Sequence, residues 1–277
     1  MRQWLPFLFA AFLVGLPRMV HAQAPKDIVR QAVQTELKAS ENDHTHWLYF
    51  ENNHQEDQNV KQWVAQARST DLARVIERNG RRLSESEQRQ EMESFMNNQK
   101  LQAKQRKSGE HDDEQAAELL RMLPDAFVWT NRGEQDGTIH FHFVPDPQFR
   151  PPDMEARVFA AMEGDMMVDA AEHRIVSLKG RLMRDLKFGF GILGSLQAGG
   201  SFDIERRKTG GSVWQITETH VHMHGHILFF KTISEEQDDV KSKFKQLPPD
   251  ISMQQAVTEL FGQDRPEMSS VRQAKRN

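Results

Sequence analysis

Short strand-forming segments follow one another from Asp125 to Leu247, and the intervals between them restrict the fold more than any other feature of the sequence. Turn signals separate the segments at Asp136-Gly137, Glu172-His173 and Gly210-Gly211. A parallel pair of strands needs a crossover connection of about a dozen residues or more, usually a helix. Intervals as short as these therefore predict antiparallel neighbours in one sheet.

The strands expected in this part of the chain cover residues 126–131, 138–144, 165–169, 175–188, 201–208, 213–223 and 227–241. Residues 157–162 are expected to form a short strand or a helical turn. Nearer the N-terminus, β-rich runs at 46–51, 62–66 and 73–78 predict further strands, which end at the turn Asn79-Gly80.

Helices are predicted on both sides of the N-terminal strands. In Lys26–Lys38, apolar residues recur at helical spacing and form one stripe: Ile28, Val29, Ala32, Val33 and Leu37. The polar stretch Arg81–Leu123 opens with Ser84 and Glu87 at the spacing of a capping box. We expect its first helix, which has Met92, Phe95 and Met96 as an apolar edge, to be mostly exposed to solvent and to form an excursion from the core.

The second helix of the polar stretch is expected to begin after Asp112 and to contact the core. Its apolar positions have the spacing i, i+3, i+4 and i+7, namely Ala116, Leu119, Leu120 and Leu123. Pro124 is expected to end this helix.

Residues 1–22 have the pattern of a signal peptide. They begin with Arg2, contain the apolar run Leu5–Leu16 and no acidic residue, and end in Val20-His21-Ala22. The apolar run is shorter than the roughly 20 residues of a membrane-spanning helix, which disfavours an uncleaved anchor. We expect cleavage after Ala22 and a mature protein that is periplasmic or secreted, with no stable membrane span.

The remaining chain is expected to form one domain over residues 23–250, with residues 81–123 as a helical insertion. Residues 251–277 are predicted to contain a short helix, Ser252–Phe261, followed by a disordered tail.

Composition and motifs exclude several classes of function. The 277 residues include no cysteine, which excludes a disulfide scaffold, a thiolate metal site and a cysteine nucleophile. The 36 Lys and Arg residues do not outnumber the 40 Asp and Glu residues, so we expect no nucleic-acid partner. No catalytic or dinucleotide-binding motif is present in the sequence, and we expect a noncatalytic protein without a cofactor.

Histidines recur at every second position in two expected strands: His140 and His142 in one, and His220, His222, His224 and His226 in the other. Side chains two apart on a strand share a face, and neutral imidazole is a good ligand for zinc, copper or nickel. A turn at His224-Gly225 would divide the second row. We interpret both rows as polar solvent faces and assign no metal ligand, and a histidine metal-binding protein remains an alternative.

The connection Lys187–Gly200 is apolar and rich in glycine, although surface connections are usually polar. Its large apolar side chains must cap a core or meet a ligand, a membrane or a partner. The residues that we predict to contact an apolar ligand are Phe188, Phe190, Ile192, Leu193 and Leu196.

The order of these segments resembles a known family. Ile76–Glu87, Leu123–Phe127, Arg181–Phe190 and Val213–Phe230 resemble segments of an uncharacterised group of secreted bacterial proteins, whose members are similar to the LolA-like superfamily of periplasmic lipoprotein carriers. The resemblance covers most of the chain from Ala24 to Leu247. It implies a curved antiparallel sheet, an incomplete barrel around helices, whose concave side holds acyl chains.

We therefore expect an α+β fold: a curved, LolA-like antiparallel half-barrel packed with helices, with a polar helical insertion. The expected function is that of a noncatalytic periplasmic binding or carrier protein for a lipid acyl chain or a lipidated protein. The alternatives are an envelope protein-interaction or sensor module, whose sheet is filled by its own side chains, and the histidine metal-binding protein.

Overall fold

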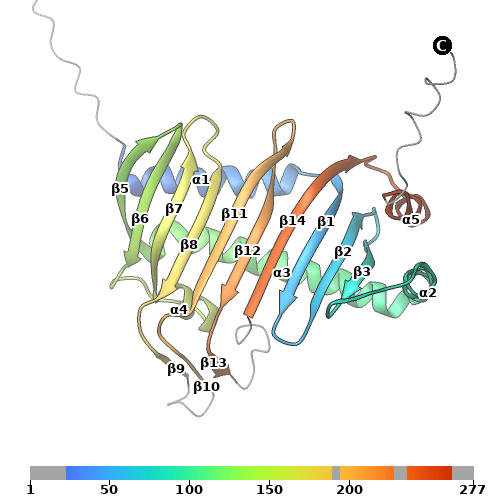
Figure 1. Ribbon diagram of the computed structural model, residues 1–277. Helices are drawn as coiled ribbons and strands as arrows, with labels where there is room; N and C mark the ends of the chain where they lie inside the picture. Colours follow the sequence, from blue (N-terminus) through green and yellow to red (C-terminus); the bar gives the residue numbers. More distant parts are fainter. Residues whose placement is uncertain (1–22, 189–193, 228–235, 264–277) are drawn as a thin grey trace, which may run out of the picture.

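The computed structural model describes residues 23–188, 194–227 and 236–263. These residues form an α+β fold whose main element is an eleven-stranded antiparallel sheet (Figure 1). Its strands are β1 (His46–Gln55), β2 (Asn59–Gln66), β3 (Asp71–Arg78), β4 (Arg81–Arg82), β5 (Phe127–Gln135), β6 (Thr138–Pro145), β7 (Met162–Asp169), β8 (Ile175–Leu182), β11 (Ser201–Gly210), β12 (Val213–His222) and β14 (Glu236–Leu247).

The strand order is β4-β3-β2-β1-β14-β12-β11-β8-β7-β6-β5, so the sheet is open, with β4 and β5 at its edges. From β5 to β12 most neighbours in space are also neighbours in sequence, as the short intervals predicted. Strand β14 lies between β12 and β1 and joins the N-terminal strands to the rest. A separate three-stranded sheet consists of β9 (Leu186–Phe188), β10 (Gly194–Leu196) and β13 (Gly225–Ile227).

Two long helices cover one face of the main sheet, which we call the inner face. They are α1 (Pro25–Asn42) and α3 (Gln99–Ala126), and Figure 1 shows both passing behind the sheet. Near one end of α3, Gln105 donates a hydrogen bond to the carbonyl of Asp71 in β3, with a distance of 3.2 Å. At its other end Leu123 is fully buried beside β5 and β6. Helix α3 therefore crosses the sheet from β3 to β5.

The main core lies on the inner face under β5–β8. The predicted stripe of α1 supplies Val29, Ala32 and Val33, all 3% exposed or less, which pack against fully buried Phe141 and Phe143 of β6. The β6 aromatics alternate with the less buried His140 and His142, as the period of two along a strand requires. The polar-face interpretation of this histidine pair is therefore supported.

Further helices cover the opposite, outer face at the β1–β3 end. Helix α5 (Met253–Gly262) and helix α2 (Glu85–Met96) pack against Leu48, Trp63 and Leu72. The guanidinium of buried Arg74 donates to Gln88 of α2 at 2.7 Å and to the carbonyl of Leu260 of α5 at 2.9 Å. This arginine therefore joins both helices to β3. The remaining helix, α4 (Met154–Phe159), precedes β7.

Two of the predicted turns, Asp136-Gly137 and Asn79-Gly80, are confirmed. Asp136 and Gly137 have φ angles of 51° and 75°, and Asn79 and Gly80 have φ angles of 50° and 76°. Positive φ at both central residues is typical of the type I′ turn, whose twist matches that of a hairpin. The Ser252–Phe261 helix is also present, as α5. The predicted signal peptide and disordered tail lie outside the described residues.

The prediction for the polar stretch was wrong in two respects. A single helix, α3, begins at Gln99 rather than after Asp112, and Pro124 lies inside its last turn. Proline removes a backbone donor and disfavours a helix interior. Here the last turn stays helical because Leu123, Pro124 and Ala126 are all buried against α1 and the sheet. The stretch thus covers the inner face with α3, and the helix expected to be an excursion, α2, packs its apolar edge on the outer face.

Two strand predictions also need correction. The strand expected at 175–188 is divided into β8 and β9, and the one expected at 227–241 is divided into β13 and β14; in each case the two parts belong to different sheets. The segment 157–162, expected as a short strand or a helical turn, begins within the helical turn α4, whose N-cap Asp153 accepts a hydrogen bond from the backbone N–H of Ala156 at 2.7 Å. Side-chain capping of this kind stabilises the start of a helix, which explains why the segment after Asp153 is helical.

The capping box of α2 gives a first testable prediction. The backbone N–H of Ser84 donates to Glu87 at 2.7 Å, and with the Ser84 hydroxyl and Arg81 it lowers the pKa of Glu87 to about 2. We expect Ser84→Ala to raise this pKa towards its ordinary value and to lower the free energy of unfolding by about 1 kcal/mol. NMR titration of the Glu87 carboxyl and urea unfolding measure both effects. Ser94→Ala, an exposed change within α2, is the control and should leave both quantities unchanged.

Candidate functional site

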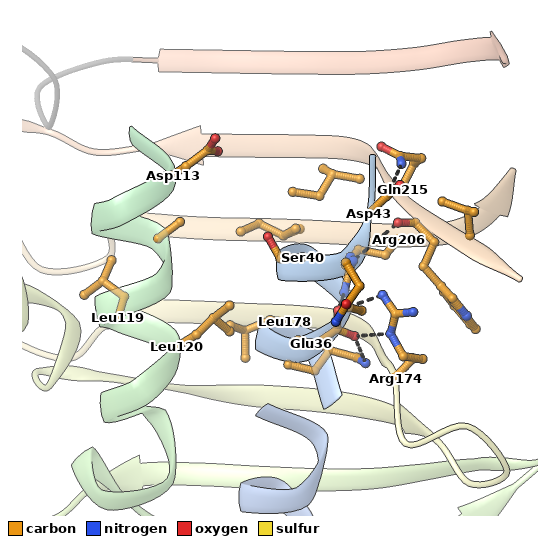
Figure 2. A pocket seen from close by; sticks show the side chains of 18 of the residues that line it. Glu36, Ser40, Asp43, Asp113, Leu119, Leu120, Arg174, Leu178, Arg206 and Gln215 are labelled. Atoms are coloured by element: carbon orange, nitrogen blue, oxygen red, sulfur yellow. Dashed lines mark hydrogen bonds and ion pairs between the residues drawn. The ribbon is translucent and has the colours of Figure 1, made fainter. Parts of the chain in front are cut away.

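A large cavity lies between the two inner-face helices and the middle of the sheet (Figure 2). Its volume is about 1110 Å³, and it is open to solvent. Helices α1 and α3 form two sides, and β8, β11 and β12 form the floor. We call this cavity the central pocket. It exists because α1 and α3 pack together near β5 and diverge over the middle of the sheet (Figure 1).

One part of the central pocket has apolar walls. Leu120 projects from α3 toward Leu178 of β8 in Figure 2, and Leu119 of α3 also contributes to the lining. From the sheet, Ile204 of β11 and Ile216 of β12 complete this part of the lining. Ile216 is 42% exposed. The apolar wall is therefore accessible and is not filled by other side chains.

A buried ion cluster closes one end of the central pocket. Glu36 of α1 is only 5% exposed and accepts two hydrogen bonds from Arg174, at 3.0 and 2.9 Å. Arg206 of β11 makes an ion pair with the same carboxylate, and the backbone N–H of Ile175 donates to it at 2.8 Å. Figure 2 shows the carboxylate between the two guanidinium groups. The cluster joins α1 to β8 and β11.

The charge state of Glu36 follows from these contacts. Burial by itself would raise the pKa of the Glu36 carboxyl, but the hydrogen bonds from Arg174 and the charge of Arg206 outweigh it and hold the pKa below its ordinary value. Glu36 is therefore ionised at neutral pH. The pocket combines an apolar wall with a permanently charged end, an arrangement that matches an amphiphilic ligand.

Beyond the central pocket the inner face carries a group of charged residues. Asp239 of β14 shares this face because it pairs with Thr219, which in turn pairs with the pocket residue Ile204. Lys241 lies 3.3 Å from Asp239 and 3.9 Å from Glu51, and both carboxylates are buried. Burial and the charge of Asp239 raise the pKa of Glu51. These charges lie next to a buried aromatic cluster that includes Trp47 and Tyr49 of β1.

The residues predicted from sequence to bind a ligand lie elsewhere. Phe188 is 1% exposed and Leu196 is fully buried, and both pack in a cluster with Leu182 and Met223 at the small sheet. Neither belongs to the lining of the central pocket. Phe190, Ile192 and Leu193 lie outside the described residues. Phe188 and Leu196 therefore fill a core, and the contact of the five residues with a ligand stays a prediction.

The second histidine row is divided, as the possible turn at His224-Gly225 indicated. His220 and His222 belong to β12, His224 follows the strand, and His226 belongs to β13. The structure places the carboxylate of Asp238 beside both β12 imidazoles. This neighbour could not be identified from spacing, because it comes from a different strand.

Sequence reasoning missed the charged end of the central pocket. One signal was present for Glu36: it continues the apolar stripe of α1, three and four residues after Val33 and Ala32. A carboxylate in a buried stripe requires a cationic partner. No local signal identified Arg174 or Arg206, because both lie far from Glu36 in the sequence.

No family model, curated protein or solved structure matches this chain. None of the helices in the described residues carries an apolar stretch long enough to cross a membrane. The site must therefore be interpreted from its own geometry.

Proposed function

We propose that the protein is a noncatalytic binding or carrier protein for a lipid acyl chain or a lipidated protein, and that it acts in the periplasm or after secretion. The observation that carries the proposal is the central pocket, an accessible apolar groove beside a buried ion cluster. The signal-like pattern of residues 1–22 supports the location. The open antiparallel sheet covered by helices is the architecture that the LolA-like resemblance implies, and we propose that relationship here.

The size of the central pocket suits this function. Ligand pockets for small molecules have volumes of about 300 to 1,000 Å³, and this one has about 1110 Å³. Each CH₂ group moved from water into an apolar groove contributes about 0.8 kcal/mol. An acyl chain lying along Leu119, Leu120 and Ile216 would place its polar end near Arg174 and Arg206.

A direct test is to look for a co-purified ligand. The mature protein, extracted under mild conditions, is expected to carry a lipid that native mass spectrometry detects and that denaturation releases. The ligand-free protein is then expected to bind a fluorescent fatty acid. A protein that carries no lipid and does not bind the fatty acid would contradict the proposal.

A paired substitution tests the location of the ligand. Ile216→Lys places a charge on the apolar wall and is expected to weaken fatty-acid binding at least tenfold, because a bound chain would desolvate the ammonium group. Val240→Lys is the matched control. Val240 is also a β-branched residue, 37% exposed, but it pairs with Glu218 and does not line the central pocket. Equal weakening in both variants, measured by fluorescence titration, would remove the central pocket from the proposal.

One observation favours the alternative of a protein-interaction module. Under β5–β8 the inner face is filled by side chains of α1, α3 and the sheet, such as fully buried Leu123 of α3 and Phe141 of β6. This part of the inner face therefore cannot hold a ligand. If the lipid assays are negative and the Ile216→Lys variant loses a protein partner in the envelope, the protein-interaction module is favoured over the lipid carrier.

A further inference from the structure

Two histidines and an aspartate meet on the outer face of the sheet, away from the central pocket. Ile204 lines the pocket and pairs with Thr219, so Thr219 faces inward. Its neighbour His220 and the residue two further along, His222, therefore face outward. Asp238 of β14 pairs directly with His220 and shares the outer face.

The three side chains are close enough to share one ion. Nδ1 of His220 lies 2.6 Å from Oδ1 of Asp238, and Nε2 of His222 lies 3.3 Å from the same oxygen. One ligand atom from each residue can be chosen so that all three lie within 4.8 Å of one another. With metal–ligand bonds of about 2.0 to 2.1 Å, ligands of one zinc ion lie about 3 to 3.5 Å apart. Small rotations of the side chains are sufficient to reach this geometry.

The distance between residues along one strand does not exclude a metal site here. Two residues on one strand are about 6.6 to 7 Å apart, which is too far for their imidazoles to share an ion without leaning together. Asp238 lies between the two rings from the neighbouring strand, and both ring nitrogens turn toward its carboxylate. The ligand set is formed by β12 and β14 together, and neither strand contains it alone.

The surroundings favour a cation. Asp203 of β11 pairs with His220 on its other side. Its Oδ2 accepts a hydrogen bond from Lys179 at 2.9 Å, whereas its Oδ1 is buried and has no hydrogen-bond partner among the described residues. Glu218 lies 3.8 Å from Nε2 of His220. Of the three carboxylates around the His220 ring, Asp203 pairs with Lys179 and Glu218 pairs with Arg207, whereas Asp238 contacts the two imidazoles. A bound cation would offset the charge of Asp238.

We propose that His220, His222 and Asp238 form a zinc site on the outer face. Imidazole nitrogen and carboxylate oxygen are ligands that suit Zn²⁺, and the half-buried site leaves a position for water or a further ligand. His54 of β1 pairs with Asp238 from the other side and is exposed, at the right place in the register for a fourth ligand. The ion would join β14 to β12, the junction through which the N-terminal strands enter the sheet. The proposal is independent of lipid binding, because the sheet separates the two sites.

The test uses the full mature chain without an affinity tag, stripped with a chelator and titrated with Zn²⁺ by calorimetry. We expect one Zn²⁺ per chain. The double variant His220→Asn/His222→Asn and the single variant Asp238→Asn are each expected to bind at least tenfold more weakly. A far-ultraviolet circular dichroism spectrum and a melting curve recorded in chelator check that the variants are folded.

The matched control is His140→Asn/His142→Asn. These residues also lie two apart on the outer face, and His142 also contacts an aspartate, Asp165, at 3.0 Å. The control should retain the affinity of the parent within about twofold. Equal weakening in both double variants, or a parent chain without stoichiometric binding, would overturn the site. An unchanged Zn²⁺ affinity of the His54→Asn variant would overturn only the assignment of His54 as the fourth ligand.

Discussion

Replacement of Glu36 by glutamine is expected to lower the free energy of unfolding by about 3 to 5 kcal/mol, the cost of removing one partner from a buried ion pair. The carboxylate is 5% exposed, and the side chains of Arg174 and Arg206 are 12% and 18% exposed. Glutamine keeps the shape but removes the charge. Two guanidinium groups would then lie close together with little access to water.

The measurement is urea unfolding at pH 7, with Glu41→Gln as the control. Glu41 lies on the same helix but is exposed, so its substitution should change the free energy of unfolding by less than about 0.5 kcal/mol. Equal stability of the Glu36 and Glu41 variants would show that the ion cluster contributes nothing to the fold.

The same pair of variants has an expected pH dependence. The folded protein holds the pKa of Glu36 below its ordinary value, so the stability that its charge provides is present above the pKa of the unfolded chain. That stability is lost as the pH falls through the folded pKa. The difference between the parent and Glu36→Gln should therefore be constant near neutrality and shrink below about pH 4.3, the ordinary pKa of glutamate. A difference that grows on acidification would contradict this assignment.

The ion cluster also connects stability to the site. Glu36 fixes the end of α1 against β8 and β11, the strands that form the floor of the central pocket. Loss of the cluster should loosen that end of the pocket before the aromatic core under β5–β8 is affected, because the core has its own contacts. The variant is thus expected to lose ligand affinity even at urea concentrations where it remains folded.

Local chemistry made much of the fold predictable. The turn at Asp136-Gly137 depends on two residues that accept positive φ, and the start of α2 depends on Ser84 and Glu87. The stripe of α1 depends on spacing within thirteen residues. In each case the interacting groups are close in the sequence, so their pattern is visible without the structure.

The site was not predictable in the same way, since it is formed by contacts between distant segments. Pairing of β14 with β1 and β12 brings Asp238 to His220, and no local pattern encodes that register. The extent of α3 was missed for a related reason. Its polar half has no apolar stripe. Gln105 and Arg106 hold it by hydrogen bonds to the backbone carbonyls of Asp71, at the start of β3, and of Ser69, in the preceding turn.

Replacement of Gly164 by alanine is expected to destabilise the protein by about 3 kcal/mol, the upper end of the range for overpacking. A Cβ atom at this position of β7 would lie 1.8 Å from the carbonyl oxygen of Lys179 in β8 and 2.8 Å from the ring of Phe143. The carbonyl belongs to the backbone and cannot move without shifting the strand. Phe143 is fully buried, and its ring centroid is 4.5 Å from that of Phe127, so the ring has little room to move.

Gly109→Ala makes the same chemical change, but it is expected to stabilise the protein. Gly109 lies within the exposed part of α3, and a Cβ atom there would meet no other atom within 4 Å. Alanine should stabilise that helix by about 0.5 to 1 kcal/mol, because glycine loses more conformational freedom on folding. Thermal and urea unfolding of both variants measure the contrast. A Gly164→Ala protein as stable as the parent would contradict the close approach of β7 and β8 at this position. It would also contradict the position of β8 in the floor of the central pocket.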